Sequence, residues 1–74
     1  MFELLVVTKG NLYDDAVVKA AGREPGASGF SFMSGERDMS FAFKTKKGAE
    51  NARTRVKAVK GVRRTSIQEE GEDD

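Results

Sequence analysis

Six segments of this sequence have a regular spacing of apolar residues, and the spacing changes between that of strands and that of helices. Residues 2–8 form an apolar, β-branched run that ends before Gly10, which predicts a buried strand. Residues 29–33 and 39–45 each alternate apolar and polar side chains, as half-buried strands do. The polar stretch 34–38 between them contains a glycine, so these two strands are predicted to form a hairpin.

The first predicted helix covers residues 12–21. Asn11 is a favourable N-cap, and Asp14 lies in the first turn, where the helix dipole favours acids. Gly22 suits the left-handed position that ends many helices. Residues 23–29 hold the only proline and two glycines, which predicts an exposed loop after this helix.

The second predicted helix covers residues 46–60 and ends before Gly61. Its small apolar residues recur three and four positions apart, so they share one side of a helix: Ala49, Ala52, Val56 and Val59. Residues 62–68 contain valine, threonine and isoleucine and predict a last strand.

The order strand, helix, strand, strand, helix, strand is typical of the ferredoxin-like split βαβ fold. This α+β fold is a four-stranded antiparallel sheet with both helices on one face. We therefore expect one domain over residues 1–68. Residues 69–74 contain five acids and no apolar side chain, and we expect them to form a disordered tail.

The two faces of the predicted sheet have different side chains. Small residues on both helices, including Ala16, Val17 and Ala20 on the first, need bulky partners in the sheet. We expect these partners to be Phe2, Leu4, Val6, Phe30, Phe32, Phe41 and Phe43. The open face would then carry Leu5, Val7, Ser31, Met33, Ser40, Ala42, Lys44 and Ile67. Its apolar centre, Leu5, Val7, Met33 and Ala42, is a candidate contact for a protein partner or a second copy.

An alternative interpretation exposes the phenylalanines. The segment Ser40-Phe41-Ala42-Phe43, with the basic stretch that begins at Thr45, resembles the third strand and second helix of the RNA-recognition motif. That resemblance implies that Phe41 and Phe43 would stack on bases. It covers only residues 37–61, and Ser40 stands where the family has a glycine. The packing argument places the same two rings in the core.

The composition limits the chemistry. The chain has 74 residues and contains neither cysteine nor histidine, so disulfides, thiol catalysis and the commonest metal ligands are absent. We expect a non-enzymatic protein without cofactor or metal. The first seven residues carry no base and are too short for a signal peptide or a membrane span, so we expect a cytoplasmic protein.

The net charge of +1 conceals a separation of charge along the chain. Residues 44–64 carry nine bases and one acid, a net charge of +8, and residues 69–74 carry −5. Four bases of the second helix fall within an arc of about 60° at about 100° per residue and form what we call the basic ridge: Lys46, Arg53, Lys57 and Lys60.

The basic ridge, with Arg63 and Arg64 just beyond it, is a candidate surface for nucleic acid or another polyanion. Two alternatives remain open at this point. Such residues also make a helix soluble, and the acidic tail is tethered close enough to compete for the same surface.

Overall fold

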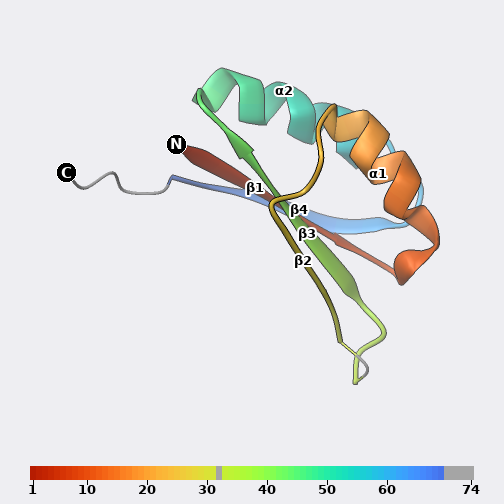
Figure 1. Cartoon of the computed structure of the whole chain (residues 1–74). Coiled ribbons are helices and arrows are strands. Elements are labelled where there is room, and N and C mark those ends of the chain that lie inside the picture. Colours follow the sequence, from red (N-terminus) through yellow and green to blue (C-terminus); the bar gives the residue numbers. More distant parts are fainter. Residues whose placement is uncertain (32, 70–74) are drawn as a thin grey trace.

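The computed structural model describes residues 1–31 and 33–69, and these residues adopt the predicted ferredoxin-like split βαβ fold. Four antiparallel strands form one sheet in the order β2-β3-β1-β4. The strands are β1 (Phe2–Thr8), β2 (Ala27–Phe30), β3 (Arg37–Phe43) and β4 (Val62–Glu69). Both helices, α1 (Asp14–Ala21) and α2 (Lys46–Lys57), cover the same face of this sheet (Figure 1).

The core lies between the sheet and the two helices. In the centre of the sheet, Leu4 of β1 pairs with Phe41 of β3 and with Ile67 of β4. Phe41 is fully buried and Phe43 is 4% exposed, which confirms their predicted place in the core. Rings that are covered in this way are not available to stack on bases, so the stacking alternative is wrong. The small residues of α2 are buried as predicted: Ala49, Ala52 and Val56.

The hairpin differs from its prediction, because both of its strands begin and end earlier in the sequence. Strand β2 covers Ala27–Phe30 instead of 29–33, and β3 covers Arg37–Phe43 instead of 39–45. The turn holds its own hydrogen bonds: the Ser31 N–H donates to the Glu36 carbonyl at 2.8 Å, and the Gly35 N–H donates to the Ser31 carbonyl at 2.7 Å. These bonds close the hairpin around residues 31–36.

This shift in the hairpin corrects part of the predicted core. Phe30 pairs with Arg37 at the end of β2 and is 43% exposed, so its predicted burial is wrong. Phe32 lies outside the described residues. Met33 lies in the turn and is 98% exposed, so the structure does not place it on the open sheet face.

Other predicted members of the open face also lie elsewhere. Ile67 pairs with buried Leu4 and packs against the core, so it belongs to the helix-covered face. Ser31 and Lys44 both lie just beyond strand ends. Ser40 and Ala42 remain on the open face, where they pair with Leu5 and with Glu3 respectively.

The first helix begins later than predicted. Residues Asn11–Tyr13 form a 3-10 turn, and the α-helix starts only after Tyr13, which is its N-cap without a side-chain hydrogen bond. The predicted cap at Asn11 is therefore wrong. Gly22 ends the helix in the predicted left-handed conformation, with φ of 80°. Ala16 is exposed, contrary to prediction, because the core side of α1 is formed by buried Val17 and Ala21.

The second helix begins as predicted and ends earlier. The Thr45 hydroxyl accepts the Gly48 N–H at 3.0 Å and caps its start. The helix ends at Lys57 instead of Lys60, and Gly61, with φ of 100°, turns the chain into β4. Strand β4 extends to Glu69, so the first residue of the predicted tail belongs to the sheet. Residues 70–74 lie outside the described residues.

Candidate functional site

The basic ridge is solvent-exposed along one flank of α2. Lys46 begins the helix, Lys57 ends it, and Lys60 lies in the turn that follows. All three side chains are exposed, and within the described residues no carboxylate lies at ion-pair distance from them. Three positive charges of the ridge are thus available to an anion in solution.

Arg53 fixes the position of this flank relative to the sheet. Its Nε donates to the Thr65 hydroxyl at 3.0 Å. Thr65 pairs with buried Val6, so its side chain is on the helix-covered face of β4, which is an edge strand. The basic ridge therefore runs above the β4 edge of the sheet. Because the partner is a neutral hydroxyl, this contact does not compensate the positive charge of Arg53.

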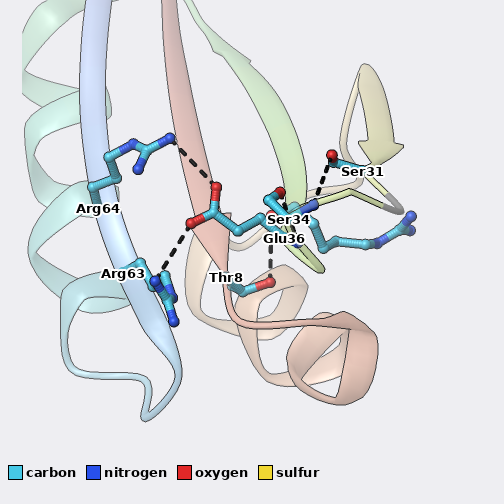
Figure 2. A network of polar contacts seen from close by, with 7 residues as sticks. Thr8, Ser31, Ser34, Glu36, Arg63 and Arg64 are labelled. Atoms are coloured by element: carbon cyan, nitrogen blue, oxygen red, sulfur yellow. Dashed lines mark hydrogen bonds and ion pairs between the residues drawn. The ribbon is translucent and has the colours of Figure 1, made fainter.

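Arg63 and Arg64 are separate from the ridge and share one acidic partner. Arg63 Nη1 lies 3.5 Å from Glu36 Oε2, and Arg64 Nη2 lies 3.6 Å from Glu36 Oε1 (Figure 2). Glu36 precedes β3, while both arginines belong to β4. These ion pairs therefore reach across β1, which lies between β3 and β4.

A β-bulge explains how consecutive arginines reach the same carboxylate. Val7 pairs with Arg64, whereas Thr8 pairs with Val62, so Arg63 is an extra residue in β4. In a regular strand, consecutive side chains point to opposite faces, and a bulge redirects one of them. The sequence predicted both arginines as candidate polyanion ligands. It gave no indication of Glu36, because the shared contact depends on the register of three strands.

The acidic end of the chain starts close to the beginning of the ridge. Glu69 pairs with Phe2, and Phe2 also pairs with Phe43 at the end of β3. Helix α2 begins at Lys46, shortly after Phe43. The end of β4 and the start of α2 therefore lie at the same end of the sheet (Figure 1). Arg63 and Arg64 lie at the opposite end of β4.

The open face of the sheet contains a small groove. It has a volume of about 170 Å³ and is lined by Leu5, Val7, Arg64, Thr65 and Ser66. Leu5 is 38% exposed there, whereas Val7 is only 5% exposed although both α1 and α2 lie over the opposite face. Of the four predicted partner contacts, Leu5, Val7 and Ala42 share this face and Met33 does not.

The described residues contain no group of three or more side chains that could hold a metal ion. In the same part of the chain, no helix is long and apolar enough to cross a membrane. No protein-family model matches the sequence, and neither a curated protein nor a solved structure matches it. The fold and the arrangement of charges are therefore the basis for a functional proposal.

Proposed function

We propose that this protein is a small non-enzymatic module that binds an anionic nucleic-acid backbone, or another polyanion, along the basic ridge. The observation that carries this proposal is a set of exposed lysines that have no carboxylate partner within residues 1–31 and 33–69: Lys46, Lys57 and Lys60. Basic side chains in a row on one helix flank can follow successive phosphates, and each contact releases counterions. Such binding fits the predicted cytoplasmic location, where RNA is accessible.

Replacing Lys57 with glutamate tests the ridge directly. We expect affinity for a labelled single-stranded RNA, and for duplex DNA, to fall about fivefold to tenfold at low salt. The slope of log affinity against log salt should become shallower by about 1, because one phosphate contact is lost. Fluorescence anisotropy over a series of salt concentrations measures both quantities.

Lys19→Glu is the matched control for this substitution. Lys19 and Lys57 are both exposed, and each lies in the last turn of a helix. The two variants therefore have the same change of charge and a similar effect on the helix dipole. Equal losses of affinity in the two variants would mean that only the net charge of the protein matters. That result would contradict a binding site on the basic ridge.

The same titration with a chain ending at Glu69 tests whether the acidic tail competes for the ridge. This end point keeps all of β4 and removes four acids. Because β4 ends near Lys46, we expect tighter binding when these acids are removed. Unchanged affinity would leave the ridge as a binding surface without competition from the tail.

The second candidate function is self-association through the open sheet face. It is favoured by the exposure of Leu5 beside the groove and by the position of α1 and α2 over the opposite face. If two copies associate in this way, Ala42→Lys should separate them, because a lysine would be desolvated in the contact. Sedimentation equilibrium measures the mass. If the unchanged protein and Ala42→Lys have the same mass, this surface is excluded as the contact. Lys57→Glu is the control and should leave the mass of the unchanged protein as it is.

A further inference from the structure

The contact between β4 and the hairpin has the chemistry of an occupied anion site. The guanidinium groups of Arg63 and Arg64 both face the Glu36 carboxylate, one at each oxygen. The Glu36 side chain is 22% exposed, whereas those of Arg63 and Arg64 are 52% and 67% exposed. The carboxylate is thus the more enclosed partner, and both arginines remain accessible from solution.

These ion pairs are long. Charge-assisted N–H···O contacts are usually about 2.7–2.9 Å, whereas the two distances here are 3.5 and 3.6 Å. Exposed ion pairs of this kind contribute little to stability. A phosphate group offers more oxygens than a carboxylate, and arginine binds phosphate oxygens through paired N–H groups. An incoming phosphate can therefore replace Glu36 at small cost.

The arginine pair follows the basic ridge along the chain but lies on the other face of the sheet. Arg64 lines the groove on the open face, whereas Arg53 of the ridge contacts Thr65 on the helix-covered face. Lys57, Lys60 and Arg63 follow each other at intervals of three residues, from the end of α2 through the turn into β4. A polyanion that follows the ridge to the end of α2 reaches the start of β4, and it must pass around this edge strand to reach the open face. The next bases along that path are Arg63 and Arg64.

We propose that Arg63 and Arg64 form a phosphate-binding site that Glu36 occupies in the free protein, and that a backbone phosphate of bound nucleic acid displaces the Glu36 carboxylate. This inference rests on the proposed function, because it assigns a second site to the same ligand. Glu36 then acts as an internal competitor that weakens binding without contacting the ridge.

The hairpin allows this exchange because its backbone is held independently of the Glu36 side chain. The Glu36 carbonyl accepts the Ser31 N–H at 2.8 Å, and the Glu36 N–H donates to the Ser34 hydroxyl at 3.3 Å. Both bonds use backbone atoms of Glu36. Glu36→Gln therefore removes the negative charge and leaves these bonds of the turn in place.

The test compares Glu36→Gln with the unchanged protein, using labelled oligouridylate at low salt. We expect the variant to bind about threefold to tenfold more tightly, the range that corresponds to the loss of modest surface ion pairs. Glu24→Gln is the matched control, because it makes the same change of charge at a residue that is exposed in the loop after α1. Circular dichroism verifies that each variant is folded.

Removing the arginines identifies where the gain arises. Replacing Arg63 and Arg64 with glutamine should lower RNA affinity more in the Glu36→Gln variant than in the unchanged protein. In the unchanged protein, Glu36 already occupies the arginine site. A non-additive result of this kind is the signature of a shared site.

The possible results separate this inference from the proposed function. If Lys57→Glu weakens binding but Glu36→Gln has no more effect than Glu24→Gln, the ridge remains and the arginine site is excluded. An additive effect of the arginine substitutions would also exclude it. If neither the unchanged protein nor Glu36→Gln binds RNA at low salt, both proposals are wrong.

Discussion

Phe41→Ala should lower the free energy of unfolding by about 3–5 kcal/mol, the range for removing a fully buried aromatic side chain. Phe41 is 0% exposed and pairs with Leu4 in the centre of the sheet. Its loss removes buried apolar surface and leaves a cavity under the helices. Domains are stable by only about 0.1 kcal/mol per residue, so this one substitution consumes about half of the stability expected for a chain of this length.

Thermal or urea unfolding followed by circular dichroism measures this effect. A decrease of about 15 °C or more in the melting temperature is expected, since each kcal/mol shifts a domain of this size by about 4–8 °C. If the alanine variant does not fold, Phe41→Leu keeps most of the volume and allows a smaller loss to be measured.

Phe30→Ala is the control, since it removes the same side chain from the same hairpin. Phe30 is 43% exposed, so we expect a loss of about 1 kcal/mol or less. Similar losses at both positions would contradict the placement of Phe41 in the core and would revive the interpretation with exposed rings.

This contrast between two phenylalanines shows how far the sequence predicts the fold. Alternation in the hairpin correctly indicated two strands, and helical spacing correctly placed Ala49 and Ala52 in the core. The pattern does not report how far the helices extend over the sheet. Phe30 has the spacing of a core residue but pairs with Arg37 at the far end of β2, beyond the main core.

The sequence also predicted the candidate site only in part. Helical periodicity alone identified the basic ridge, because all four of its members belong to one helix or the turn that follows it. The partners of these bases come from other elements. Thr65 meets Arg53 only because β4 lies beneath α2, and Glu36 meets the arginines only through the strand order and a bulge. A local pattern contains no information on such contacts.

Gly61→Ala is the second substitution for which we expect a large effect, a loss of about 2–4 kcal/mol in the free energy of unfolding. Two causes add at this position. Gly61 has φ of 100°, where a side chain is strained. A Cβ there would also lie 2.5 Å from the Cδ2 and Cε2 atoms of the Tyr13 ring, far inside van der Waals contact.

Gly35→Ala separates these causes. Gly35 also has positive φ, 73°, but a Cβ there would meet no atom of the described residues within 4 Å. We expect Gly35→Ala to lower the free energy of unfolding by about 1 kcal/mol, the cost of the backbone conformation alone. Urea unfolding of both variants measures the difference. Equal losses would mean that the Tyr13 ring moves aside without cost.

A double-mutant cycle with Tyr13→Leu tests the contact itself. If the ring causes the additional loss, Gly61→Ala should lower the free energy of unfolding by less once the ring is absent, and the effects of the two substitutions should not be additive.

The Gly61 carbonyl also accepts the Lys9 N–H at 3.0 Å, so the same residue joins the end of β1 to the start of β4. This turn connects the end of α2 to Arg63 and Arg64. Gly61→Ala should therefore also weaken RNA binding if the basic ridge and the proposed phosphate site hold one strand.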